Sequence, residues 1–276
     1  MPPDALTQNA AGFLALVALA VAAIVEVRVI RRIARDGGQV RMDEFRMPDA
    51  LVALVLATFF AVAGLGALFQ HAEKSAAVTV DKVLPGALVF LVLLIGVAGF
   101  LSFRGLKLMP LLGLNRLPFR HVVGWTLGLV LTAFALTAAA NVFTAALLRG
   151  QTEAQSLVQL FRTVAQRGDG AAMLKIVVAG AVLAPVCEEF LFRGFFYAVG
   201  KRYLGPLASG FVTALLFAAI HQSLTAFAGL FVLAVCLTLA YERTGSLLVP
   251  IGMHALYNFT SLLFIWLQAR GIISLT

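Results

Sequence analysis

The sequence predicts an all-α fold, a polytopic bundle of about eight transmembrane helices. Of the 276 residues, 61% are hydrophobic and only 12% are charged, and the mean hydropathy of +0.98 is far above that of a soluble domain. Apolar blocks of about 17 to 25 residues also recur along the chain, and each matches one helix across a ~30 Å hydrocarbon layer. A single membrane bundle accounts for these observations better than two soluble domains do.

The apolar blocks give the positions of the expected spans. They lie at residues 10–27, 49–69, 84–101, 122–148, 173–200, 206–222, 226–241 and 247–267. The first block lacks the basic start and cleavage site of a signal peptide, and its basic residues, beginning at Arg28, follow it instead. We therefore expect it to remain as an anchor.

Basic residues gather in the loops after the first, third, fifth and seventh spans. These loops and the adjoining part of the fifth span hold 14 of the 21 Lys and Arg residues, namely Arg28, Arg31, Arg32, Arg35, Arg41, Arg46, Arg104, Lys107, Arg116, Arg120, Arg193, Lys201, Arg202 and Arg243. Because cytoplasmic loops collect Lys and Arg, we expect both termini outside. The Ala/Val/Leu/Arg-rich composition predicts a prokaryotic inner (plasma) membrane. The net charge of +8 then reflects orientation and contact with the lipid bilayer. No basic-aromatic stripe indicates a nucleic-acid partner.

The first four spans carry almost no ionisable residue at mid-depth, which predicts packing and lipid contact. Residues 149–170 are polar with apolar positions at helical spacing, so an amphipathic helix at the outer surface is expected there. His71 falls in an expected loop and is given no role. Polar residues inside spans concentrate from position 188 onward, so the chain divides functionally into residues 1–172 and a part at 173–268 that carries these polar residues.

Two adjacent carboxylates, Glu188 and Glu189, lie within an apolar run where each charge is costly. Arg193 follows Glu189 at i+4, in the better orientation for a helical ion pair. Glu188 is rotated by about 100° from its neighbour on a helix, so it needs a partner from another helix. The alternative is a structural ion-pair network, which one arginine serves poorly because it neutralises only one acid.

Two histidines are candidate partners for Glu188. His221 lies near the end of one apolar block, and His254 shares a helical face with Asn258 in another. A carboxylate flanked by imidazoles can deprotonate a water, and Asn258 or a protonated His can donate to an oxyanion, as peptide hydrolysis requires. A rise of about 1.5 Å per residue puts Glu188 and His221 at about 20 to 24 Å depth but His254 at about 13 Å. Tilted helices must bring them together.

These residues carry a resemblance to a known family. Glu188-Glu189 with Arg193, Phe217 with His221, and His254 with Asn258 resemble, in order, the three motifs of the CAAX protease and bacteriocin-processing family, the type II CAAX endopeptidase-like or Abi proteins. The resemblance covers roughly residues 173–268. It implies that Glu188 and His221 activate a water, that Arg193 holds Glu189, and that His254 and Asn258 bind the carbonyl or assist the water. Phe217 is expected to shape the substrate site.

The resemblance leaves the cofactor open. Family members are described both as metalloproteases and as glutamate-dependent proteases, and this sequence lacks the H-E-x-x-H spacing of many zinc sites. If a divalent metal such as zinc is required, the resemblance implies Glu188, His221 and His254 as its ligands.

The sequence favours an intramembrane endopeptidase acting on a membrane-associated protein or peptide. Prenylated C-terminal motifs, leader peptides and other membrane proteins all remain candidate substrates. A proton- or ion-coupled transporter is the alternative from another class, since buried acids and histidines also form proton relays, but the chain shows no repeats. A catalytically idle scaffold or bacteriocin-immunity protein that keeps the family fold is the third.

Overall fold

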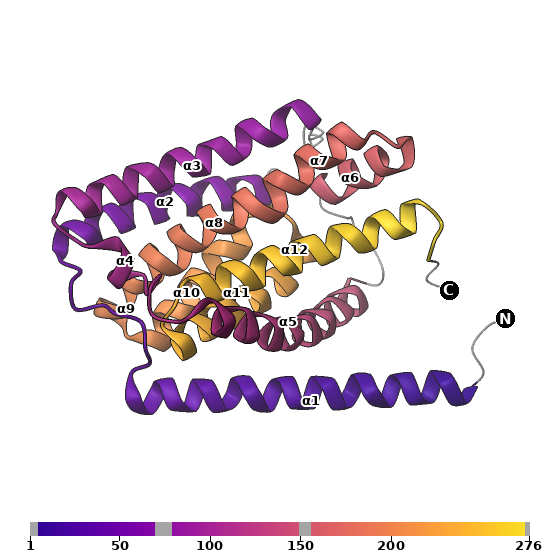
Figure 1. Cartoon of the computed structure of the whole chain (residues 1–276), viewed down its shortest axis with the longest axis horizontal. Coiled ribbons are helices and arrows are strands. Elements are labelled where there is room, and N and C mark those ends of the chain that lie inside the picture. The colour runs from indigo at the N-terminus through magenta and orange to yellow at the C-terminus, as the bar shows by residue number, and fades with distance from the viewer. Residues whose placement is uncertain (1–4, 70–78, 149–155, 274–276) are drawn as a thin grey trace.

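The computed structural model describes residues 5–69, 79–148 and 156–273, and these residues form helices and turns without a strand (Figure 1). The predicted His71 loop and residues 149–155 lie outside the described part. The first half contains α1 (Ala5–Asp36), α2 (Met47–Phe69), α3 (Val80–Phe103), α4 (Leu108–Leu111), α5 (Phe119–Leu147) and α6 (Ser156–Arg167). The predicted all-α bundle is confirmed.

The second half begins with one long, continuous helical segment. Its parts are α7 (Gly170–Val178), the π-helical η1 (Ala179–Leu183), α8 (Ala184–Glu189), the π-helical η2 (Phe190–Tyr197) and α9 (Ala198–Leu204). Three further helices follow, α10 (Pro206–Ile220), α11 (Leu224–Thr244) and α12 (Leu248–Ala269).

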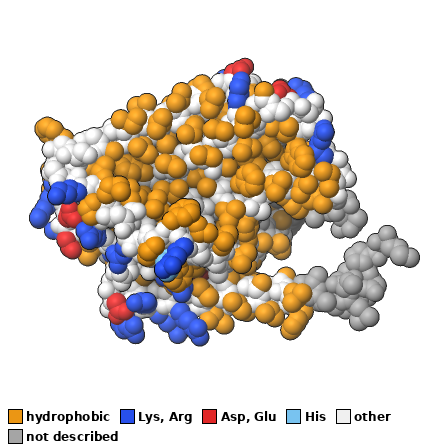
Figure 2. All heavy atoms as spheres, viewed as in Figure 1, with side chains coloured by type: hydrophobic (Ala, Val, Ile, Leu, Met, Phe, Trp, Pro, Cys, Tyr) orange, Lys and Arg blue, Asp and Glu red, His pale blue; other side chains and the backbone are white. Residues whose placement is uncertain are grey.

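Seven helical segments of the described chain are long and apolar enough to cross a membrane. Figure 2 shows hydrophobic side chains over most of the visible face, with Lys and Arg side chains toward its ends. An apolar belt of this kind is what a lipid-facing surface requires, so the chain is an integral membrane protein. The remaining predicted span, 206–222, is the shorter helix α10 of 15 residues.

The first helix is longer than the sequence predicted. The expected span ended at residue 27, with the arginines in the following loop, but α1 continues to Asp36. Arginine is a good helix former, so the helix does not have to end where the apolar block ends. It ends at Gly37 and Gly38, whose φ angles of 78° and 75° suit glycine.

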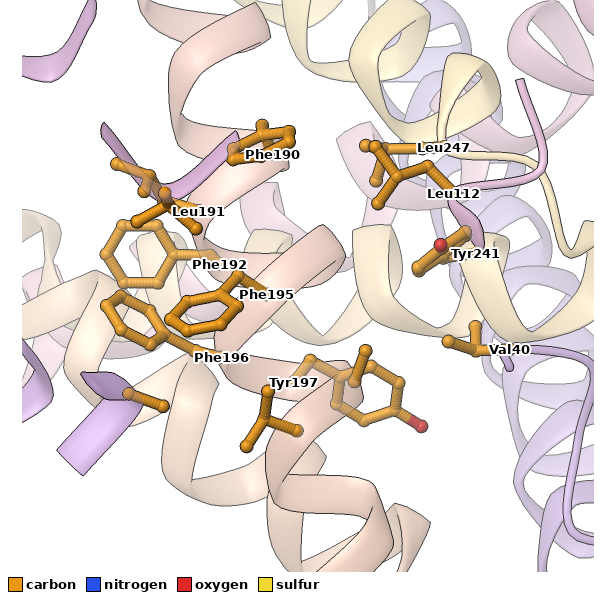
Figure 3. Packing of buried hydrophobic residues seen from close by; sticks show 14 of the residues in the cluster. Val40, Leu112, Phe190, Leu191, Phe192, Phe195, Phe196, Tyr197, Tyr241 and Leu247 are labelled. Atoms are coloured by element: carbon orange, nitrogen blue, oxygen red, sulfur yellow. The ribbon is translucent and has the colours of Figure 1, made fainter. Parts of the chain in front are cut away.

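Among the apolar clusters that hold the bundle together, two are the largest. Figure 3 shows the largest one, built around buried side chains of η2 such as Phe192 and Phe196, which contact Phe60 of α2. A second cluster joins α5 to α11 and α12, where Ala133 and Leu237 are fully buried. Both clusters combine residues from before and after position 172, so the two halves share their cores. The functional division at 172 stays a prediction.

The basic loops meet at one end of the bundle. The backbone N–H of Gln39 donates to the carbonyl of Glu242 at 3.2 Å, and that of Leu247 donates to the carbonyl of Leu112 at 3.0 Å. The Glu242 carboxylate also accepts from Lys201 Nζ at 2.6 Å. These contacts join the segments after α1, α4, α9 and α11, as the charge pattern predicts. The side of the membrane that this end faces remains a prediction.

Helix α6 lies within the segment predicted to be amphipathic. Its apolar face, with Phe161 and Val164, is buried against Ile176 of α7 and Leu262 of α12. The helix therefore uses its apolar face to pack on the bundle beside η1, and its position at the outer membrane surface stays a prediction.

Candidate active site

The two glutamates lie on α8, a short α-helical stretch between π-helical segments. Pro185 has no N–H, and a proline ring inside a helix clashes with the carbonyl four residues earlier, here that of Ala181 within η1. A π-helical turn relieves such a clash, and π turns in helices are frequent at functional sites. In η2, a Cβ added at Gly194 would lie 2.9 Å from Leu112 Cδ2, so glycine permits close packing there.

Glu189 is completely buried and joins three helices. Its Oε1 accepts from Arg193 Nη1 at 2.9 Å and from His254 Nδ1 at 2.8 Å. Arg193 in turn donates through Nη2 to the carbonyl of Ala234 on α11 at 2.9 Å. The i,i+4 pair expected from the sequence is therefore present, and it extends to α11 and α12.

Glu188 is the more accessible carboxylate, with 12% of its side chain exposed. Its Oε2 faces Nε2 of His254 at 3.9 Å, beyond direct hydrogen-bond distance. Because Nδ1 of His254 donates to Glu189, Nε2 of the neutral ring carries a lone pair. Two hydrogen-bond acceptors thus face each other across this gap.

His221 caps the C-terminus of α10 and is half-buried. Its Nδ1 lies 2.7 Å from the carbonyl oxygen of Phe217, and a carbonyl can only accept, so Nδ1 donates. Nε2 of the neutral ring is then the free basic nitrogen. Within the described chain, no direct contact joins His221 to Glu188.

Phe217 links the polar residues. Its ring centroid is 4.7 Å from that of His221, 5.8 Å from that of His254, and 4.7 Å from Cζ of Arg193. The side chain is fully buried, so it lies behind the polar groups and orients them. The expected role of Phe217 in shaping the substrate site stays a prediction.

Asn258 lies one turn after His254 on α12. Its Nδ2 donates to the carbonyl of Gly180 in η1 at 2.8 Å. Successive turns of α12 therefore meet successively earlier residues of the long segment, Glu189 and then Gly180, as antiparallel packing requires. One N–H of the Asn258 amide thus joins helices, and its role toward a substrate stays a prediction.

The depths estimated from the sequence did not establish whether the helices bring Glu188, His221 and His254 together. The 2.8 Å contact between His254 and Glu189 shows that α8 and α12 converge. The structure gathers Glu188, Glu189, Arg193 and His254, while His221 joins this group through the Phe217 ring.

Residues 170–260 match the family described as type II CAAX prenyl endopeptidase Rce1-like. The predicted family resemblance is confirmed. The matched part of the chain contains every residue of the site described above. A protein of Escherichia coli described as "Uncharacterized 24.3 kDa protein" is 39% identical over 88 residues, which are 30% of this chain and 41% of that protein. This chain thus matches less than half the length of that relative. No solved structure matches the chain.

The donor atoms of the matched segment meet only part of what the metal set implied by the resemblance requires. The Nε2 lone pairs of His221 and His254 suit zinc. In the described chain, however, no group of three or more His, Cys, Asp and Glu side chains lies close enough together to hold a metal ion. The described residues therefore do not assemble Glu188, His221 and His254 as a ligand set.

Sequence reasoning missed the hydrogen bonds of the site in which the acceptor is a backbone carbonyl, because a sequence motif does not mark such an acceptor. The acceptor of Arg193 is a backbone carbonyl, that of Ala234, and Asn258 likewise bonds the carbonyl of Gly180. Pro185 within an apolar helical run was the available signal for the π-helical turn at η1.

Proposed function

We propose that this protein is an intramembrane endopeptidase, in which Glu188 activates a water that hydrolyses a peptide bond of a membrane-associated protein or peptide. The observation that supports the proposal most is the 3.9 Å approach of Glu188 Oε2 to His254 Nε2, while Glu189 and Arg193 hold the imidazole from behind. The Rce1-like match over residues 170–260 supports the same class of reaction.

The two facing acceptors suit a water molecule. A water at about 2.8 Å from each atom donates one O–H to the Glu188 carboxylate and the other to His254 Nε2. Its lone pairs then point away from both groups, toward a peptide carbonyl carbon. Such a water is held in place and activated by the same contacts.

The reaction follows from these positions. Glu188 takes a proton as the water oxygen bonds to the carbonyl carbon, and the carbonyl oxygen becomes an oxyanion. The C–N bond then breaks, and the proton passes from Glu188 to the leaving amine nitrogen. His254 Nε2, with its ring held by Glu189, accepts the other O–H of the water and keeps the water oxygen aimed at the carbonyl carbon, and the second N–H of Asn258 is available to donate to the oxyanion. His221 Nε2 serves as a second proton acceptor at the site.

We place the protein in a prokaryotic inner membrane, with the basic end in the cytoplasm and both termini outside. The support is the basic-loop excess and the contacts that bring those loops to one end. Residues 173–268 form the catalytic core, and residues 1–172 pack against it. No comparable observation supports the transporter hypothesis or the idle-scaffold hypothesis.

The test is cleavage of a library of fluorogenic membrane-proximal peptides by purified protein, with and without chelator and added zinc. Parent protein and Glu44→Gln, a carboxylate change on a basic loop, are expected to cleave, whereas Glu188→Gln is expected to be inactive. Equal cleavage by all three proteins would contradict the assignment. Loss with chelator and recovery with zinc would establish a metal requirement.

A further inference from the structure

Helix α10 ends before it has crossed the membrane. It starts at Pro206, directly after Gly205 at the basic end, and its 15 residues span about 22 Å at about 1.5 Å per residue. The hydrocarbon layer is ~30 Å thick, so the turn after Ile220 lies within the apolar depth, on the side away from the basic loops. Any tilt of the helix places the turn deeper.

The turn at this depth is polar. It consists of His221, Gln222 and Ser223, of which Gln222 is exposed and the other two are half-buried. Non-helical backbone inside a membrane is tolerated where it is buried in protein or lines a water-filled cavity. Because Gln222 is exposed, the second condition applies.

Gln222 has two further properties. Its φ of 52° is the only positive φ of a non-glycine residue in the described ranges, a conformation that a side chain with a Cβ adopts at a cost. Its N–H donates to the carbonyl of Ala219 at 3.1 Å, but its side-chain amide bonds to no other described residue. A polar side chain is thus held at the turn, beside His221, with its hydrogen-bonding capacity unused.

We propose that the His221–Ser223 turn is the aqueous mouth of the site and that the Gln222 side-chain amide hydrogen-bonds the main chain of a peptide substrate there. This inference rests on the proposed endopeptidase function. An amide offers both a donor and an acceptor, which are the two groups that an extended peptide presents at each residue. A contact of this kind is independent of substrate sequence, and it places the peptide beside His221 and the partly exposed Glu188.

Three substitutions of Gln222 distinguish a contact with the substrate from an effect on the stability of the fold. Gln222→Gly removes the amide and the cost of the left-handed backbone together, so it is expected to keep or raise Tm while KM rises roughly 2- to 12-fold, the range for one hydrogen bond. Gln222→Asn keeps an amide and tolerates the conformation, so KM is expected to recover toward the parent value. Gln222→Ala loses the amide but keeps the Cβ, so it is expected to raise KM as Gln222→Gly does, without a gain in Tm. An unchanged KM in Gln222→Gly would overturn the substrate contact.

A second measurement, which does not depend on activity, tests whether the His221–Ser223 turn is accessible to water. Gln222→Cys is expected to react with a membrane-impermeant maleimide from the side opposite to Asp43→Cys, whose position on a basic loop is 90% exposed. Phe211→Cys, at a 56% exposed apolar position of α10, is the lipid-facing control and is expected to stay unlabelled. The parent gives the background, since Cys187 and Cys236 are buried.

Absence of labelling of Gln222→Cys, or labelling from the same side as Asp43→Cys, would contradict the proposal that the turn is the aqueous mouth of the site. Failure of the parent to cleave any peptide would instead count against the proposed function, because the labelling result does not depend on cleavage. Cleavage lost in Glu188→Gln together with an unchanged KM in Gln222→Gly would leave the proposed function standing and remove only this inference.

Discussion

Replacement of Arg193 by alanine tests whether the buried ion pair holds the site together. Arg193 is 2% exposed and Glu189 is 0% exposed, so the substitution leaves a carboxylate in a site with no access to water. Removing one partner of a buried pair costs about 3–5 kcal/mol. The hydrogen bond to the Ala234 carbonyl and the contact with the Phe217 ring are lost in the same change.

The expected size of the effect follows from the length of the chain. A loss of 1 kcal/mol lowers Tm by roughly 2–4 °C in proteins of about 150–250 residues, so Arg193→Ala is expected to lower it by about 6–20 °C. Thermal unfolding in one detergent, followed by circular dichroism, measures this shift. The matched control is Arg202→Ala, whose side chain is 31% exposed and lies 3.9 Å from Asp43, and its Tm is expected to fall by less than about 4 °C.

A double variant, Glu189→Leu with Arg193→Leu, separates the stranded charge from lost packing. Because both charges are removed together, it is expected to be more stable than Arg193→Ala alone. A Tm for Arg193→Ala equal to that of Arg202→Ala would refute the reasoning. A double variant less stable than the single one would show that the pair itself, and not the stranded carboxylate, dominates.

Three further changes test other parts of the site. His254→Ala is expected to lower the cleavage rate at least about 100-fold, since it removes one of the two groups that hold the water, while His121→Ala on the exposed start of α5 leaves the rate unchanged in the same assay. Asn258→Ala is expected to lower stability by about 1 kcal/mol through loss of the Gly180 contact, measured by denaturant unfolding, and an unchanged midpoint would contradict that tie. Phe217→Leu is expected to lower kcat while KM changes little, because the buried ring orients the two imidazoles without touching substrate; a change confined to KM would instead make Phe217 a substrate contact.

The fold was largely predictable because lipid imposes a simple rule on sequence. An apolar block long enough to span the hydrocarbon layer has to form a helix, since no water is present to pair its backbone. Helix ends were less predictable, because hydropathy indicates which residues lie in the hydrocarbon layer, and a helix can end before or after that layer does. Thus α1 runs on past residue 27 to Asp36, and α10 stops at Ile220, two residues before the predicted end of its span at 222.

The local part of the site was also predictable. The pair of Glu189 and Arg193 depends only on helical spacing, and the structure contains it. The contact of His254 with Glu189 depends on the tilt and packing of two helices, and depths counted along straight helices cannot supply it. The sequence offered both His221 and His254 as partners of Glu188; the structure places His254 Nε2 3.9 Å from Glu188 Oε2 and connects His221 through a phenylalanine ring.

The most direct test of the proposed mechanism is the cleavage rate of Glu188→Gln relative to the parent, measured on one membrane-inserted peptide in lipid nanodiscs. Glutamine keeps the shape of the side chain but cannot take a proton, and the partly exposed position leaves Tm unchanged. General-base catalysis predicts a rate at least about 100- to 10,000-fold lower in a folded protein. A variant that is equally stable and cleaves at the parent rate would contradict the role of Glu188.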